Sequence, residues 1–241
     1  MAEPLHSDAP TDPDSTSTSF GYRVLRRLGA AFTFRDFRVL WLGAFTSTTG
    51  SWMQQVAQRW LVLTMTGSAF ILGLDSFLAQ LPILLFILIG GVIADRKDRR
   101  YLLIGSQCVQ MTSAFILAAL VYFDIVQVWH ILLLSFVSGC GQAFGGPAYM
   151  SLLPTLVPKQ TVPNAIALNS IQFNLARVFG PLIAGITLAA LGTAACFGLN
   201  GLSFFVVIIA LMSLRVKHVP PTNQRPMMEE LRGGLSYVKH E

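Results

Sequence analysis

Three ionisable residues, Arg59, Asp75 and Arg177, stand inside long apolar stretches of this sequence. A charge in the hydrocarbon core of a membrane is costly and usually marks a pathway or a paired internal contact. Arg59 lies eight residues before Gly67 and Asp75 lies eight residues after it. On two antiparallel helices joined at Gly67, both side chains would lie about 12 Å from the turn. This spacing predicts an Arg59–Asp75 ion pair, which would serve either as a structural clasp or in gating and proton coupling.

Arg177 shares one predicted helix face with Ser170, Asn174 and Pro181, which recur at helical spacing. An unpaired arginine buried in lipid would be very costly, so this face is expected to border a wet cavity or a partner residue. Guanidinium groups grip carboxylates and phenolates through two parallel hydrogen bonds. We therefore expect Arg177 and Asn174 to contact an anionic group of a substrate. The alternative is a structural arginine bonded to carbonyl groups of neighbouring helices.

Polar residues also form stripes on other apolar stretches. One stripe holds Ser47, Ser51, Gln54 and Gln58, with Gln55 beside it; a second holds Ser135, Ser138 and Gln142; and Gln80 accompanies Asp75. The stripes predict a polar cavity in which Gln54, Gln58 and Gln142 touch substrate. The alternative is interhelical glue, in which such side chains bond across packed helices for about 0.6 kcal/mol each.

The elements that must position these residues are transmembrane helices. The chain has 241 residues, 53% hydrophobic and 12% charged, and this excludes an ordinary soluble domain. A helix needs about 20 apolar residues to cross a bilayer, and continuously apolar runs argue against a β-barrel. We predict an all-α integral membrane protein with six spans, at about 39–63, 69–94, 102–122, 128–153, 162–191 and 194–214.

The basic residues predict how the bundle is oriented. Of the 17 lysines and arginines, 15 flank the first span, follow the second or fourth, or follow the sixth, and the three opposite loops have none. By the positive-inside rule both termini are cytoplasmic. We expect residues 1–31 to be a disordered cytoplasmic tail, 32–216 the six-helix bundle, and 217–241 a cytoplasmic segment that begins a surface helix.

A compact charged turn joins the second and third predicted spans. It reads Gly91-Val-Ile-Ala-Asp95-Arg96-Lys97-Asp98-Arg99-Arg100. This turn resembles the G-x-x-x-D-R-x-G-R-R signature of the major facilitator superfamily, with Asp98 where that family usually has glycine. The resemblance implies that Gly91, Asp95, Arg96, Arg99 and Arg100 form a cytoplasmic latch against a partner half of the transporter. A plain positive-inside loop would require the basic residues but not Asp95.

A second motif lies in the fifth span, where Gly180-Pro181-Leu-Ile-Ala184-Gly185 follows Arg177. It resembles the Gly-Pro-x-x-Gly-Gly motif of facilitator-superfamily antiporters, with Ala184 replacing one glycine. Gly180, Pro181 and Gly185 would then form a helix-packing motif. The similarity covers about Phe32 to Glu241 and is closest to the exporter branch that includes enterobactin exporters and macrolide efflux proteins. Because members of the superfamily have twelve spans, the resemblance implies an N-terminal six-helix half.

Several classes of function have no support in the sequence. It has no G-x-x-x-x-G-K-[ST] motif for ATP, no G-x-S-x-G and no H-E-x-x-H, so we predict no enzyme. His6, His130, His218 and His240 lie outside the spans or at their edges, so we expect no metal and no cofactor. The basic residues flank apolar stretches, which fits a membrane and not a nucleic acid.

The resemblance to facilitator-superfamily exporters implies proton-coupled efflux of a small molecule, such as a siderophore or drug, across a bacterial inner membrane. Asp75 is the only acid well inside a span and is therefore the expected proton carrier. The expected partners are the substrate, the bilayer, and a C-terminal six-helix half or a second copy. The alternative is a non-transporting fragment or a membrane-embedded interaction partner, because alternating access needs two halves that rock against each other.

Overall fold

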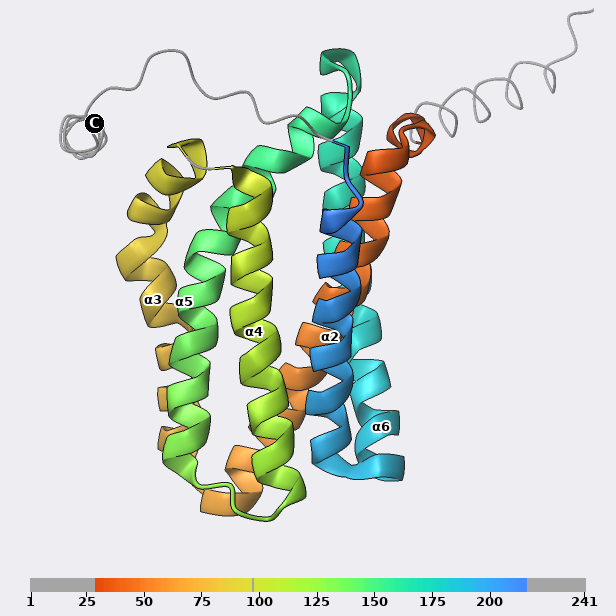
Figure 1. Cartoon of the computed structure of the whole chain (residues 1–241). Helices are drawn as coiled ribbons and strands as arrows, with labels where there is room; N and C mark the ends of the chain where they lie inside the picture. The colour runs from red at the N-terminus through yellow and green to blue at the C-terminus, as the bar shows by residue number, and fades with distance from the viewer. Residues whose placement is uncertain (1–28, 97, 216–241) are drawn as a thin grey trace, which may run out of the picture.

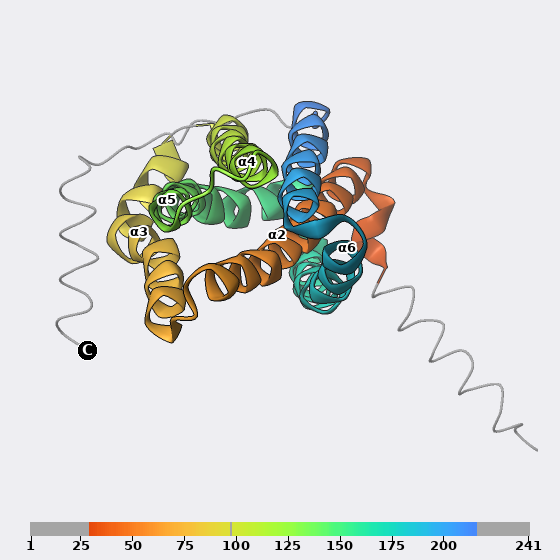
Figure 2. The ribbon, with the colours of Figure 1, turned by 90° about the horizontal axis from the view of Figure 1, so that it is seen from below.

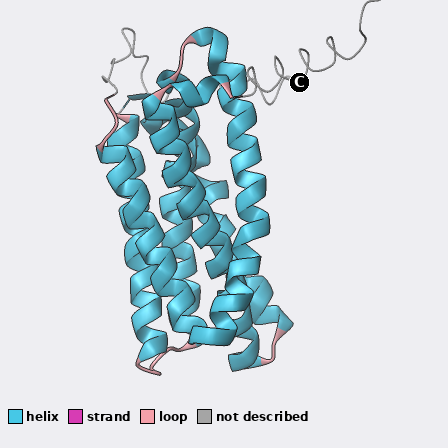
Figure 3. Cartoon of the chain, turned by 90° about the vertical axis from the view of Figure 1, so that its right-hand side faces the viewer, coloured by secondary structure: helices cyan, strands magenta, loops and turns pink. Residues whose placement is uncertain are grey.

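The computed structural model describes residues 29–96 and 98–215, in which helices are joined by short connections (Figure 1). The helices are η1 Ala30–Thr33, α2 Arg35–Thr66, α3 Ala69–Arg96, α4 Arg99–Tyr122, α5 Val128–Leu152, η2 Leu153–Leu156, η3 Lys159–Thr161 and α6 Val162–Met212. No strand occurs among the described residues, and the secondary-structure colouring of Figure 3 shows helices and loops only. The prediction of an all-helical fold is confirmed.

The helix α6 is two helices joined at a reversal. Gly192 has φ 80° and ψ −179°, which interrupts the helix between residues 191 and 193. Gly67, which ends α2, has φ 60°. A backbone with positive φ favours glycine because that residue has no Cβ. In Figure 1 the α2–α3 turn, the α4–α5 loop and the bend of α6 lie at the lower end of the bundle. The other ends of these helices, including the described start and end of the chain, lie at the upper end.

The six helical segments match the predicted spans closely, with differences at their ends. The helix α2 begins at Arg35 instead of residue 39, and α4 begins at Arg99 instead of 102. Four helices in the described part of the chain are long and apolar enough to cross a membrane: Ala69–Phe86, Arg99–Tyr122, Val128–Leu156 and Lys159–Met212. The fourth contains the reversal at Gly192. The helix α2 is not among them, although it has 32 residues.

Helices approach one another closely where they carry glycine. A Cβ on Gly145 would collide with the Ser106 side chain, and one on Gly139 would collide with the Ala79 carbonyl group. These contacts join α5 to α4 and to α3, and the ribbons of α3 and α4 lie beside α5 in Figure 2. In lipid, where no hydrophobic force drives helices together, small residues let backbones pack at van der Waals distance.

The described residues before α2 differ from the sequence prediction. Ala30 and Ala31, predicted to belong to the disordered tail, lie in η1. Ala31 is fully buried, and its backbone N–H donates to Asn164 Oδ1 at 2.9 Å. This contact anchors the chain before α2 begins. The rest of the predicted tail, Lys97, and the predicted cytoplasmic segment 217–241 lie outside the described residues.

Candidate functional site

A buried carboxylate joins the three helices α2, α3 and α5. Asp75 on α3 is 4% exposed and Ser135 on α5 is 5% exposed. Gln58 on α2 donates from Nε2 to both carboxylate oxygens of Asp75 at 2.9 Å. The same nitrogen lies 2.8 Å from Ser135 Oγ, whose hydroxyl also donates to Asp75 Oδ1. A buried carboxylate needs such donors, because losing water without replacement costs several kcal/mol.

The predicted Arg59–Asp75 ion pair is not formed. Arg59 is exposed and donates from Nη2 to Gln55 Oε1 at 3.1 Å, one turn earlier on α2. Arg59 forms no ion pair with a described residue, whereas Arg35 and Asp36 form a salt bridge at 3.1 Å. The spacing argument estimated only distance along the helix axis. Successive residues are turned by about 100° around that axis, so Gln58 faces Asp75 and Arg59 faces elsewhere.

A second polar cluster lies one helical turn away on α2. Asn200 is 2% exposed and donates from Nδ2 to Gln54 Oε1 at 2.6 Å. Its Oδ1 accepts a hydrogen bond from Ser203 Oγ at 3.0 Å. Gln54 and Gln58 therefore link the second half of α6 to α3 and α5 through one face of α2. Sequence reasoning missed Asn200 and Ser203, although two polar residues three apart in an apolar stretch are a recognisable signal.

Arg177, whose face the sequence predicted to border a wet cavity or a partner residue, is exposed in this chain. Its guanidinium carbon lies 5.6 Å from the centroid of the Trp52 ring, within cation–π range. Phe173 packs edge-on against the same tryptophan, with ring centroids 5.9 Å apart. Asn174 is also exposed and donates to the Ser170 carbonyl group at 2.8 Å. Gln142, the remaining predicted substrate contact, is exposed on α5.

The facilitator-like turn is built around a helix cap. Asp98, with φ −61°, is the N-cap of α4 and accepts a hydrogen bond from the Arg100 backbone N–H at 2.9 Å. An ordinary φ means that no glycine is needed at this position. Arg99 donates from Nη1 to the Ser151 carbonyl group at 3.0 Å, which ties α4 to the end of α5. Gly91 lies in α3 with open space beside it. Asp95 and Arg96 also lie in α3.

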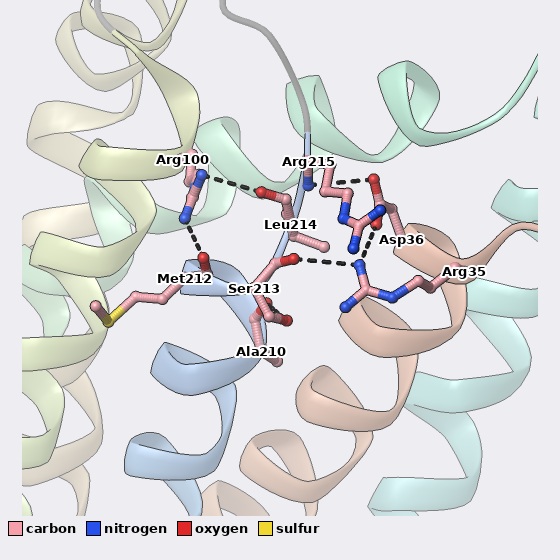
Figure 4. A network of polar contacts seen from close by, with 8 residues as sticks. All are labelled: Arg35, Asp36, Arg100, Ala210, Met212, Ser213, Leu214 and Arg215. Carbon is pink, nitrogen blue, oxygen red and sulfur yellow. Dashed lines mark hydrogen bonds and ion pairs between the residues drawn. The ribbon is translucent and has the colours of Figure 1, made fainter.

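Two arginines hold the end of α6 beside the starts of α2 and α4 (Figure 4). Arg100 donates to the carbonyl groups of Leu214 and Met212. Arg35 donates to the Ser213 carbonyl group at 3.3 Å. The last carbonyl groups of a helix lack intrahelical partners and carry partial negative charge, so cations stabilise this end.

The residues of the Gly-Pro motif differ in their surroundings. A Cβ on Gly180 would collide with Trp52 Cβ and lie 2.9 Å from the Thr49 carbonyl oxygen. Pro181 lies inside α6. Gly185 has nothing within 4 Å of the position of a Cβ. Of the two glycines in the motif, Gly180 therefore packs closely against α2 and Gly185 does not.

The chemistry available in the described part of the chain is proton binding, hydrogen bonding and anion binding. No group of three or more His, Cys, Asp or Glu residues is placed there to hold a metal ion. Asp75 can take up or release a proton. Arg177 can pair with an anion.

Comparison with known proteins places the chain in a class. The family described as "Transmembrane secretion effector" matches residues 29–241. The chain belongs to this family, a branch of the major facilitator superfamily of multi-pass membrane transporters. The predicted family is thereby confirmed.

Individual relatives give the same result. The chain is 29% identical to the staphyloferrin A transporter of Staphylococcus aureus over 72% of its own length and 44% of that protein. It is 24% identical to macrolide efflux protein A of Streptococcus pyogenes, over 84% of this chain and 51% of the relative. It is 25% identical to the enterobactin exporter of Shigella boydii, over 89% and 51%. The family and these names indicate a transporter and not an enzyme. The chain spans about half the length of these relatives.

Proposed function

We propose that this chain is the N-terminal six-helix half of a secondary active transporter that exports a small molecule in exchange for protons. The observation that carries the proposal is the buried Asp75 carboxylate, shared by three helices of a chain from an exporter family. The names of the relatives support a siderophore or a drug as cargo.

The geometry supports six membrane crossings with cytoplasmic termini in a bacterial inner membrane. The reversal at Gly192 divides α6 into two segments, which with α2 to α5 make six. Arg35, Arg99 and Arg100 all contact groups at one end of the bundle. The three opposite loops have no lysine or arginine. This asymmetry is the one that orients membrane helices.

Asp75 is the proposed coupling residue because protonation changes what it can bind. As a carboxylate it accepts hydrogen bonds from Gln58 and Ser135. As a neutral acid it gains a donor and loses acceptor strength, so the Gln58 amide must shift or turn. That change alters contacts of α3 with both α2 and α5. Protonation is therefore converted into a rearrangement of helices that would line the substrate path.

Substrate contacts are proposed for the polar groups on the same helices. Arg177, Asn174 and Gln142 are exposed in this chain and free to face a bound molecule. Gln54 and Gln58 bond to Asn200 and Asp75. These two glutamines would bind substrate by exchanging those bonds. This exchange gives a direct route between substrate binding and the proton site.

The charged turn is proposed as the cytoplasmic latch against the other half of the transporter. Gly91, Asp95, Arg96, Arg99 and Arg100 match the motif of the superfamily. Arg99 and Arg100 already bind carbonyl groups of α5 and of the segment ending α6. The latch would thus be fixed to two helices that move with the bundle.

The half-length match to the relatives favours a second candidate: a non-transporting fragment or membrane-embedded interaction partner. Efflux from energised cells separates the two. Cells would express the chain alone, or fused to the C-terminal half of the related macrolide efflux protein, and would be loaded with a macrolide. We expect export by the fusion and its loss in Asp75→Asn and Arg177→Ala fusions. Export by the lone chain would indicate assembly with a second copy, and no export by any form would contradict the proposal.

A further inference from the structure

Two arginines inside the bundle, Arg59 and Arg177, have no acidic partner among the described residues. Asp75 is held by Gln58 and Ser135. Among the described residues neither Arg59 nor Arg177 forms an ion pair. Both are exposed in this chain. A guanidinium group cannot lose its charge in a protein, so each must be solvated by water or bound to an anionic or hydrogen-bond-accepting group of a partner or ligand.

The two arginines lie on the same side of the α2–α6 pair. Trp52 and Arg59 are seven residues apart on α2, so they share a face, with Gln55 between them. Arg177 of α6 lies within cation–π distance of Trp52, and Arg59 donates to Gln55. At Trp52, Arg177 of α6 therefore approaches the face of α2 that also carries Arg59.

The exposed flanks of the first half of α6 differ in chemistry. On one flank the exposed side chains are Ile171, Leu175, Val178, Leu182 and Ile186. The adjoining flank exposes the polar residues Ser170, Asn174 and Arg177 beside the apolar residues Ile166 and Phe173. An apolar flank is stable against lipid, whereas an arginine there would be costly. The polar groups of Asn174 and Arg177 therefore require contact with water or a ligand, and Arg59 and Gln55 add further polar groups on α2.

The helix geometry sets the spacing of the two charges. Arg177 lies level with Trp52, and Arg59 lies seven residues further along α2. At 1.5 Å per residue this places the arginines about 10 Å apart along the bundle axis. The Arg177 guanidinium carbon lies 5.6 Å from the centroid of the Trp52 ring, and its N–H donors can bind a planar anion.

We propose that Trp52, Gln55, Arg59, Asn174 and Arg177 form a binding surface for a small molecule with two anionic groups, such as two carboxylates, separated by about 10 Å along the bundle axis. Arg177 binds one group and Arg59 the other, with Gln55 and Asn174 as adjacent polar contacts. This inference rests on the proposed function because it names the substrate class of that transporter. It concerns binding, which requires neither a proton gradient nor a second half.

Calorimetric titration of the purified chain in nanodiscs of neutral phosphatidylcholine tests the inference. Phosphatidylcholine headgroups have no net charge, so the lipid does not compete with the probe as an anion. The probes are biphenyl dicarboxylate, biphenyl monocarboxylate and the uncharged biphenyl dicarboxamide. We expect the dicarboxylate to bind most tightly and the dicarboxamide not to bind. Affinity for the dicarboxylate should fall as salt is raised, since exposed charges are screened.

The variants identify the residues responsible. Arg59→Gln and Arg177→Gln should each weaken dicarboxylate binding at least about tenfold, the value expected for a charge-assisted hydrogen bond. Arg177→Lys should retain part of the affinity because it keeps the charge. Arg38→Gln is the matched control: it removes an exposed positive charge near the start of α2 and should bind as the unaltered chain does.

Three results would overturn the inference: no dicarboxylate binding by the unaltered chain, equal binding of the dicarboxamide, or unchanged binding by both arginine-to-glutamine variants. Export by the fusion together with any of these would leave the transport proposal standing and remove only the anion site. Arginine-dependent binding without export by the fusion would support the anion-binding surface and contradict the transport proposal. Retained thermal stability of the variants would show that lost binding is not lost folding.

Discussion

At the scale of single residues, the hydrogen bonds of Asp75 decide which neighbours depend on it. Gln58 donates to its carboxylate, whereas Arg59 donates to Gln55. A double-mutant cycle on thermal stability should therefore find coupling between Gln58→Ala and Asp75→Asn of about 0.6 kcal/mol or more. The cycle of Arg59→Gln with Asp75→Asn should be additive within about 0.5 kcal/mol. Strong coupling between Arg59→Gln and Asp75→Asn would show that Arg59 and Asp75 do form an ion pair.

The same residues show what sequence could and could not predict. Composition and spacing were enough to select Asp75 as a buried acid, because charge in an apolar stretch is rare. They were not enough to choose its partner. Gln58 and Arg59 are adjacent in sequence but point about 100° apart, and that direction depends on how α2 packs against α3 and α5. Asn200 was missed for a related reason, since its importance depends on Gln54 of another helix.

At the scale of helices, the Gly-Pro motif makes a prediction with an internal control. Gly180→Ala would push a methyl group into Trp52 and the Thr49 carbonyl oxygen, and should destabilise the bundle by about 1–3 kcal/mol. Gly185→Ala has open space and should be neutral or stabilising by up to about 1 kcal/mol, because alanine favours helix. Thermal unfolding in detergent measures both. Equal effects of the two substitutions would contradict the observed packing.

The cap of α4 gives a second prediction for a helix. Asp98→Ala removes the side chain that accepts from the Arg100 N–H and should cost about 1 kcal/mol. Asp98→Gly restores the residue usual in the superfamily motif and should cost only a few tenths of a kcal/mol. Denaturation midpoints of the two variants test this order. A glycine variant less stable than the alanine variant would refute it.

Helix positions were largely predictable from the sequence, because hydrophobic length and turn glycines mark the spans. The residues at which α2 and α4 begin were not. The helices α2 and α4 start earlier than predicted, within the charged residues Arg35 and Arg99. A hydropathy argument stops where charge begins, but a helix continues as long as its end is capped or paired. Asp98 and the contact of Arg35 with Ser213 provide those interactions.

At the scale of the whole molecule, the chain presents one end rich in arginine contacts and an opposite end of short loops. Arg35 and Arg100 hold the end of α6 against α2 and α4. Replacing both with glutamine should therefore loosen this end and leave the Asp75 cluster intact. Hydrogen exchange should rise at residues 209–215 and stay low around residue 75. Equal increases at both places would show that the two ends are not independent.

The central claim is that Asp75 couples proton movement to export, and transport driven by an imposed pH gradient tests it most directly. Proteoliposomes would contain the chain fused to the C-terminal half of the macrolide efflux relative, with a macrolide as cargo, and the Asp75→Asn form would be compared with it. We predict that a pH gradient drives accumulation by the unaltered fusion, while the Asp75→Asn form shows no response to the gradient. Accumulation by the Asp75→Asn form at the unaltered rate would contradict the account.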